Sequence, residues 1–134
     1  MDSKQEEQNR QQKERNRFSV IARIKSYNHA WRGLSILIKT SHNVWAGIFV
    51  GLLAIYLGFI LNISNSEWLF LAFSIFLVFI TEAFNTAIEI DINLTSPEYH
   101  PYARDTKDVA AGAVLLSIIL SIIVALFIFL PKIL

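Results

Sequence analysis

Three long apolar segments constrain the fold of this chain of 134 residues more than any other feature. They cover residues of about 44–61, 68–90 and 107–130, and residues 44–61 and 109–130 contain no charged side chain. A helix that spans a bilayer needs roughly 20 predominantly apolar residues. The sequence therefore predicts three transmembrane helices, of which the second reaches that length only if it includes the polar residues at its end.

The composition agrees with a membrane protein. Hydrophobic residues make up 54% of the chain, and a mean hydropathy of +0.45 is too high for an ordinary soluble domain of this size. The absence of cysteine from the sequence excludes disulfides, thiolate metal sites and a cysteine nucleophile. A chain this small has little interior in which to enclose polar groups, so we expect an oligomer.

The N-terminal part divides into two segments before the first span. Residues 1–17 are almost wholly polar, which favours a disordered tail, with a short solvent-exposed helix as the alternative. Residues 18–40 begin the membrane domain, 18–134, and alternate apolar and basic side chains in a helical pattern. The apolar positions at this spacing are Val20, Ile24, Tyr27, Trp31, Leu34 and Ile38. This pattern predicts an amphipathic helix on the membrane surface; a helix packed only on protein is the alternative.

The distribution of basic residues predicts the orientation in the membrane. Nine of the 12 Lys and Arg residues precede residue 44, and the other three are Arg104, Lys107 and Lys132. The loop between the first two spans, 62–67, contains no basic residue. Because cytoplasmic loops are enriched in Lys and Arg, we expect the N-terminus and the second loop in the cytoplasm and the C-terminus outside.

A polar stripe interrupts the second span. At about 100° per residue on a helix, five polar side chains share one face, whereas Asp91 points away. The five are Glu82, Asn85, Thr86, Glu89 and Asn93. Counted from Trp68 at about 1.5 Å per residue, Glu82 lies about 21 Å into the membrane and Glu89 about 31 Å. Ionisable residues at membrane depth are costly and mark functional sites.

The second loop adds further polar groups at the same cytoplasmic boundary: Glu98, His100, Lys107 and Asp108. Carboxylates bind Mg²⁺ together with substrate phosphates, and a carboxylate near the membrane can take a proton from a lipid hydroxyl. A lysine can neutralise phosphate charge during transfer. This set favours phosphoryl transfer from a nucleotide to a membrane-embedded alcohol. The alternative is structural: the carboxylates pair with Arg or Lys of neighbouring helices.

Other nucleotide and protease motifs are absent from the sequence. It contains no GxxxxGK[ST] loop, no protein-kinase glycine-rich loop and no HExxH zinc motif. A P-loop kinase, a protein kinase and an intramembrane zinc protease of that type are therefore excluded.

The stretches "EAFNTAIE" and "PEYHPYARDTKDVAAGAVLL" are similar to those of the prokaryotic diacylglycerol kinase and undecaprenol kinase family, with a resemblance over about residues 23–134. The resemblance implies an all-α membrane protein with a surface helix and three spans, assembled as a homotrimer with shared active sites. It implies ATP and Mg²⁺, a lipid alcohol such as undecaprenol or diacylglycerol, no nucleic-acid partner, and a multi-pass location in the bacterial inner (plasma) membrane with a cytoplasmic active site.

The resemblance also implies roles for particular residues. Glu82 matches the catalytic base of the family, Asn85 the amide beside it, and Glu89 a metal-binding carboxylate that also faces ATP. The matches to nucleotide-contacting positions are Glu98, Tyr99, His100, Lys107 and Asp108.

This sequence departs from the family pattern at three positions. Ser41 occupies the usual position of the second metal-binding Glu, and a hydroxyl is a poor substitute for a carboxylate on Mg²⁺. A usual Arg falls on Ala22, with Arg23 adjacent, and a usual Asp falls on Asn93. The leading interpretation is an ATP-dependent lipid kinase; the alternative is a catalytically degenerate paralogue that binds lipid or nucleotide in the membrane.

Overall fold

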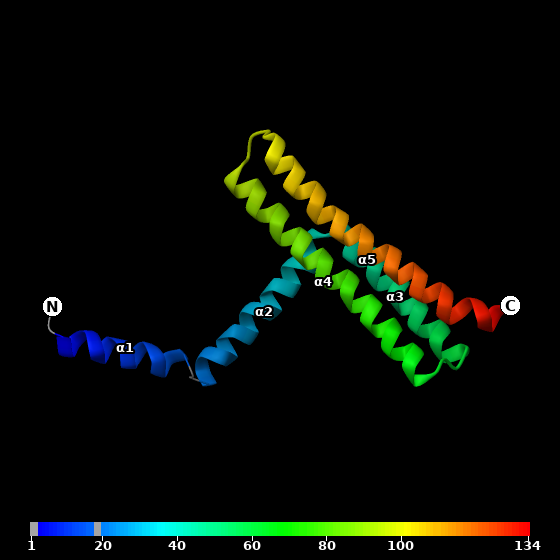
Figure 1. Cartoon of the computed structure of the whole chain (residues 1–134), viewed down its shortest axis with the longest axis horizontal. Coiled ribbons are helices and arrows are strands. Elements are labelled where there is room, and N and C mark those ends of the chain that lie inside the picture. Colours follow the sequence, from blue (N-terminus) through cyan, green and yellow to red (C-terminus); the bar gives the residue numbers. More distant parts are fainter. Residues whose placement is uncertain (1–2, 18–19) are drawn as a thin grey trace. The chain divides into compact units, whose positions relative to one another are not determined.

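The computed structural model describes residues 3–17 and 20–134, where all regular structure is helical. Three helices there are long and apolar enough to cross a membrane (Figure 1). The prediction of an all-α membrane protein with three spans is confirmed. Residues 1–2 of the predicted tail and 18–19 of the predicted surface helix lie outside the described residues.

The chain divides into two compact units after Ile36. In the first unit, α1 (Ser3–Arg17) is helical, which replaces the expected disordered tail by its alternative, and the side chains of residues 5–12 are exposed. Glu6 and Arg10 stand four residues apart, a spacing that favours a helix. The second helix, α2 (Val20–Thr40), exposes apolar side chains such as Tyr27. Its placement on a membrane surface stays a prediction.

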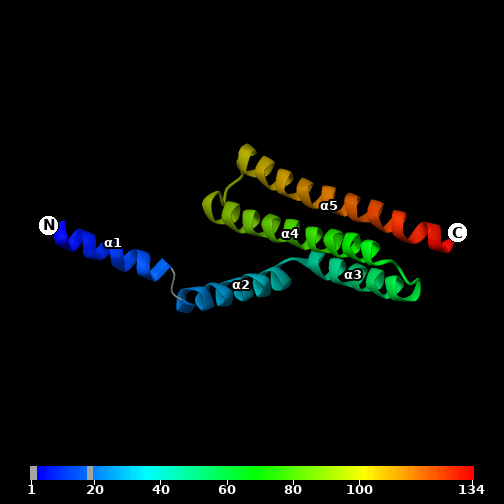
Figure 2. The same ribbon diagram turned by 60° about the horizontal axis from the view of Figure 1, so that its bottom comes forward.

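The second unit contains α3 (His42–Ile60), α4 (Asn65–Thr95) and α5 (Pro101–Ile133), each antiparallel to its neighbour in the chain (Figure 2). The contact of α4 with α5 is the most extensive. With 31 and 33 residues, these two helices exceed the 19 residues of α3. Because Glu82 lies beside the start of α3, the part of α4 that follows extends about 20 Å past that point.

Local sequence signals explain where α4 begins and ends. The Ser64 side chain accepts a hydrogen bond from the Glu67 N–H at 3.3 Å, and the Glu67 carboxylate accepts one from the Ser64 N–H at 2.7 Å. This capping box starts the helix before the expected residue 68. The helix ends at Thr95 because the following residue precedes Pro97, and a residue before proline disfavours helical backbone.

Prolines also lie at both ends of α5. Pro101 occupies the first turn, where its fixed φ suits the helix and its missing N–H costs nothing. Pro131 lies inside the last turn, and the helix continues through it to Ile133. The helix therefore extends three residues beyond residue 130, the expected end of the third span. A proline this close to the end removes one backbone donor but leaves few residues beyond it to displace.

Two kinds of contact hold the three helices together. At the end formed by the α3–α4 loop, a core cluster contains Ile63, Leu71, Ile128 and Phe129, and Lys132 Nζ lies 3.2 Å from a Glu67 carboxylate oxygen. Along the α4–α5 interface, hydroxyl groups replace apolar packing: Thr81 and Ser117 are hydrogen-bonded at 2.9 Å. Small side chains let two helices approach closely in lipid, and each such hydrogen bond contributes about 0.6 kcal/mol.

Gly58 lies where α3 meets the start of α4. A Cβ added there would lie 2.8 Å from the ring of Trp68 and 3.1 Å from Ile63, whereas one added at Gly112 would meet nothing within 4 Å. We predict that Gly58→Ala lowers the free energy of unfolding by about 1–3 kcal/mol, as overpacking does. The control Gly112→Ala should raise it by about 0.5–1 kcal/mol through helix propensity. Thermal unfolding in detergent micelles measures both, and equal effects of the two variants would contradict the packing argument.

Candidate functional site

The first part of the polar stripe of α4, residues 82–86, faces the interior of the helix bundle. Glu82 is only 3% exposed, Asn85 8% and Thr86 5%. The Ser41 hydroxyl, at the junction of α2 and α3, donates a hydrogen bond to Glu82 Oε2 at 3.3 Å. Burial of a carboxylate is costly unless hydrogen bonds or charges compensate it. The hydrogen bond from Ser41 is one such compensation for Glu82.

Asn85 links this buried pair to the exposed Glu89 one turn further along. Its Nδ2 donates to Glu89 Oε1 at 3.1 Å. Within the described part of the chain, Asn85 Oδ1 is a buried side-chain oxygen with no hydrogen-bond partner. Beyond the Ser41–Glu82 pair, this part of the stripe has the carboxylate of Glu89 and the unpaired amide oxygen of Asn85, and Mg²⁺ prefers oxygen ligands of these kinds.

These residues fit a magnesium ion that substrate phosphates help to hold. No group of three or more His, Cys, Asp or Glu side chains with metal-binding geometry occurs among residues 3–17 and 20–134. Mg²⁺ in phosphoryl-transfer sites usually keeps several waters and takes one or two carboxylates plus phosphate oxygens. An ion held here by a single carboxylate would need phosphate oxygens and waters to complete its coordination.

A groove of about 330 Å³ runs along the bundle away from Glu82. Small residues of α3, among them Gly47, Gly51 and Ala54, form one side, and residues of α4 and α5 form the others. The lining is mostly apolar, and Glu82 is its ionisable side chain. From Glu82 to Leu71, which also lines it, the groove follows α4 for about 16 Å. A long hydrocarbon chain with a polar end matches this shape.

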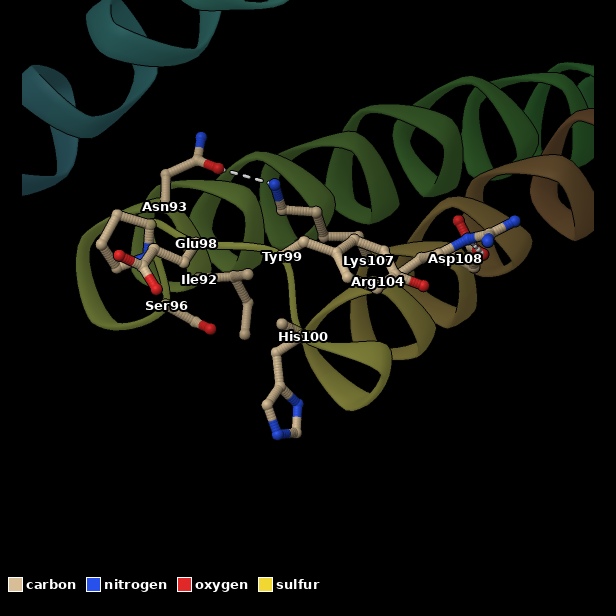
Figure 3. A pocket seen from close by; sticks show the side chains of 11 residues that line it. Ile92, Asn93, Ser96, Glu98, Tyr99, His100, Arg104, Lys107 and Asp108 are labelled. Atoms are coloured by element: carbon tan, nitrogen blue, oxygen red, sulfur yellow. Dashed lines mark hydrogen bonds and ion pairs between the residues drawn. The ribbon is translucent and has the colours of Figure 1, made fainter.

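A second cavity, of about 290 Å³, lies at the connection between α4 and α5 (Figure 3). It brings together five of the predicted nucleotide-contacting residues: Glu98, Tyr99, His100, Lys107 and Asp108. Glu89, the sixth, lies outside this lining, one turn before Asn93 on α4. The N-terminal end of α5 contributes to the cavity, and helix N-termini favour phosphate.

The polar side chains of this cavity are paired in different ways. Lys107 Nζ donates to Asn93 Oδ1 at 2.6 Å, so its charge is held by a neutral amide. Arg104 lies 3.6 Å from Asp108 in an exposed ion pair, which is a weak interaction that a phosphate can replace. His100 Nδ1 accepts a hydrogen bond from the Tyr102 N–H at 3.3 Å and so caps α5. Its imidazole points away from Lys107 (Figure 3).

The two cavities are separate along α4. Glu82 in the groove and Asn93 in the α4–α5 cavity are eleven positions apart on the helix, which corresponds to about 16 Å. Glu89 lies between them. Sequence reasoning identified Glu82, Glu89 and the loop residues, but it did not identify Arg104 or the groove. The cluster of small residues in α3 was the one signal of the groove, and it is also the pattern of ordinary helix packing.

Comparison with known proteins identifies the family. The family model described as prokaryotic diacylglycerol kinase matches residues 28–129. The chain belongs to this family. It is 37% identical over 119 residues to undecaprenol kinase of Bacillus subtilis, a match that covers 89% of this chain and 93% of that protein.

Two diacylglycerol kinases are also similar. The protein of Synechocystis sp. is 37% identical over 110 residues, which cover 81% of this chain and 63% of that protein. The protein of Escherichia coli K12 is 33% identical over 101 residues, which cover 75% of this chain and 82% of that protein. The predicted family is therefore confirmed, and the chain is a membrane lipid kinase with ATP as the phosphate donor implied by the family.

Proposed function

We propose that this kinase transfers the γ-phosphate of ATP to the hydroxyl of undecaprenol or diacylglycerol, with Glu82 as the general base. The observation that carries the proposal is the apolar groove with one buried carboxylate at its end. The hydrocarbon part of a lipid alcohol fits the groove, and its hydroxyl then meets Glu82. The names of the similar proteins, undecaprenol kinase and diacylglycerol kinase, support these two acceptors.

In the proposed reaction, Glu82 accepts the proton of the lipid hydroxyl while that oxygen attacks the γ-phosphorus. The bond from the γ-phosphorus to the β–γ bridging oxygen breaks, which leaves ADP and a lipid phosphate. Asn85 lies one turn from Glu82 and holds Glu89 by its amide. General acid–base catalysis by a positioned side chain contributes typically 10²–10⁴-fold.

The α4–α5 cavity is the proposed nucleotide site. Lys107 and Arg104 carry positive charge there, and either can contact phosphate oxygens. Glu89, between the cavity and Glu82, would hold Mg²⁺ together with those phosphates. Asn85 lies one turn before Glu89 and is bonded to it, so its Oδ1 could provide a further oxygen ligand. The ion would supply neutralisation of phosphate charge.

We also infer a homotrimer with the N-terminus and the α4–α5 connection in the cytoplasm. Large apolar side chains such as Phe49, Phe73 and Phe127 are exposed on all three spans, so lipid or other copies of the chain must cover them. The shared active sites that the family resemblance implies agree with the exposure of Glu89. Bacterial inner-membrane placement follows from the same family resemblance.

The first functional prediction concerns Glu82. Purified protein given radiolabelled ATP should phosphorylate undecaprenol, diacylglycerol or both, and offering each lipid separately identifies the acceptor. Glu82→Gln should keep the fold and nucleotide binding but lose turnover by at least ~10²-fold, because an amide cannot accept the proton.

The matched control for this variant is Asp91→Asn, an exposed carboxylate on the opposite face of the same helix. Its turnover number should equal that of the wild type. Wild-type protein that phosphorylates neither lipid would favour the catalytically degenerate paralogue, and near-normal turnover of Glu82→Gln would remove that residue from the mechanism.

The second functional prediction concerns the groove. Val50 is exposed yet lines the groove, so Val50→Trp fills it at little cost to the core. We expect the KM for the lipid to rise several-fold while the KM for ATP stays unchanged, because the α4–α5 cavity is about 16 Å beyond Glu82. Leu53→Trp is the control, since Leu53 is exposed and does not line the groove. Equal lipid KM values in the two variants would show that the lipid binds elsewhere.

The third functional prediction concerns orientation. The excess of Lys and Arg before residue 44 predicts that the C-terminus lies outside the cytoplasm. A reporter enzyme that is active only outside the cytoplasm should be active when fused after Leu134 and silent when fused before Met1. The opposite pattern of activity would invert the topology.

A further inference from the structure

The junction between α2 and α3 presents an unusual serine. Ser41 is the N-cap residue of α3, with extended backbone at φ −98° and ψ 117°. A serine at this position normally accepts a hydrogen bond from a backbone N–H of the first helical turn. In this structure the Ser41 side chain makes no such capping bond. Its hydroxyl instead donates to Glu82 Oε2, 41 residues away in the chain.

The acceptor of this bond is a buried carboxylate. Glu82 is 3% exposed, and in the described part of the chain the salt bridges involve other acidic residues. As the proposed base, Glu82 accepts this bond as a carboxylate, and a hydrogen bond to a charged group is stronger than one between neutral groups, although at 3.3 Å this one is long. Because Glu82 is buried, water does not compete for this bond as it would at an exposed carboxylate. The Ser41 hydroxyl therefore constrains the orientation of the Glu82 side chain.

The backbone around Ser41 is held on both sides. The Ser41 N–H donates to the Leu37 carbonyl at 3.0 Å, and Trp45 Nε1 donates to the Ile38 carbonyl at 3.1 Å. Leu37 itself is buried. These contacts tie the last turn of α2 to the first turn of α3, so the hydroxyl of Ser41 reaches Glu82 from a constrained position.

We propose that Ser41 is a positioning residue for Glu82. By holding one carboxylate oxygen, the hydroxyl orients the other to accept the proton of the lipid alcohol at the end of the groove. This inference rests on the proposed function of Glu82 as the base. It gives position 41, where the family resemblance leads one to expect a metal ligand, a different task in this chain.

The test compares Ser41→Ala with Ser41→Thr in the lipid kinase assay. Because the Ser41–Glu82 bond is long at 3.3 Å, we take the lower end of the range for a hydrogen bond to a charged group, about 1.5 kcal/mol, so Ser41→Ala should lower kcat by roughly 10-fold. The KM values for ATP and lipid and the Mg²⁺ concentration for half-maximal rate should change less than about twofold. Ser41→Thr keeps the hydroxyl and should restore kcat to within about threefold of wild type.

A matched control is Ser35→Ala, because Ser35 is exposed and its hydroxyl donates to the Trp31 carbonyl of its own helix. It should leave kcat unchanged. Ser41→Ala loses no capping bond, but it removes a hydrogen-bond partner of the buried Glu82 and should therefore lower the unfolding temperature somewhat. Thermal unfolding of all variants in detergent shows that each is folded at the assay temperature, so that kcat is compared for equal amounts of folded protein.

A double-mutant cycle separates positioning from a general structural effect. If Ser41 acts through Glu82, adding Ser41→Ala to Glu82→Gln should lower the residual kcat by less than about twofold, because the two changes remove one coupled function. An additive effect in the double variant would overturn the proposal. So would a Ser41→Ala variant with normal kcat, or one in which only the Mg²⁺ requirement changes.

Failure of this inference and failure of the proposed function are distinguishable. A wild-type protein that phosphorylates neither lipid overturns both. An active wild type that depends on Glu82 but not on the hydroxyl at position 41 overturns only the positioning of Glu82 by Ser41.

Discussion

The cost of placing a carboxylate among apolar helices governs the arrangement of this protein. Glu82 lies in the middle of α4 and is almost fully buried, where a charge needs compensating hydrogen bonds. The junction at Ser41 provides one, and it also sets where α3 begins relative to α4. As a result α3 begins beside Glu82 and contacts the part of α4 that precedes this residue. The remaining turns of α4 extend beyond α3 together with α5. The separation of the apolar groove from the α4–α5 cavity follows from that arrangement.

The α4–α5 pair provides the rigid support for both cavities. In hydrocarbon, apolar side chains gain little by leaving lipid, so close packing and hydrogen bonds between helices must stabilise the pair. The hydrogen bonds of Thr81 with Ser117, and of Ser121 with the Ser74 carbonyl, supply both requirements. Ser74 is 1% exposed and Ser117 4%. Because these side chains are small, α4 and α5 approach closely in the part of the interface that precedes Glu82 on α4. Glu82 therefore lies next to a well-packed interface.

Charge is distributed unevenly between the two cavities, and this matches the proposed division of substrates. The groove contains one ionisable group at its end, which suits a neutral alcohol with a long apolar body. The α4–α5 cavity contains Lys107, whose hydrogen-bond partner Asn93 is a neutral amide, so this contact brings no negative charge to the lysine. An aspartate at position 93, as the family pattern has it, would neutralise part of that charge. Glu89 lies on α4 between Glu82 of the groove and Asn93 of the α4–α5 cavity.

The sequence by itself determined the three spans and the polar stripe, because these depend on hydropathy, on helical periodicity and on local signals such as Ser64 with Glu67 and Pro101. It also predicted roles for Glu82 and the loop residues through the family motif. Only the tertiary structure decided that Ser41 donates to Glu82, that the small residues of α3 border a groove, and that Asn93 holds Lys107. Each of these joins residues far apart in the chain, and helical periodicity describes a single helix without specifying which face meets which. Packing between helices sets those pairings, and no pattern within one segment encodes them.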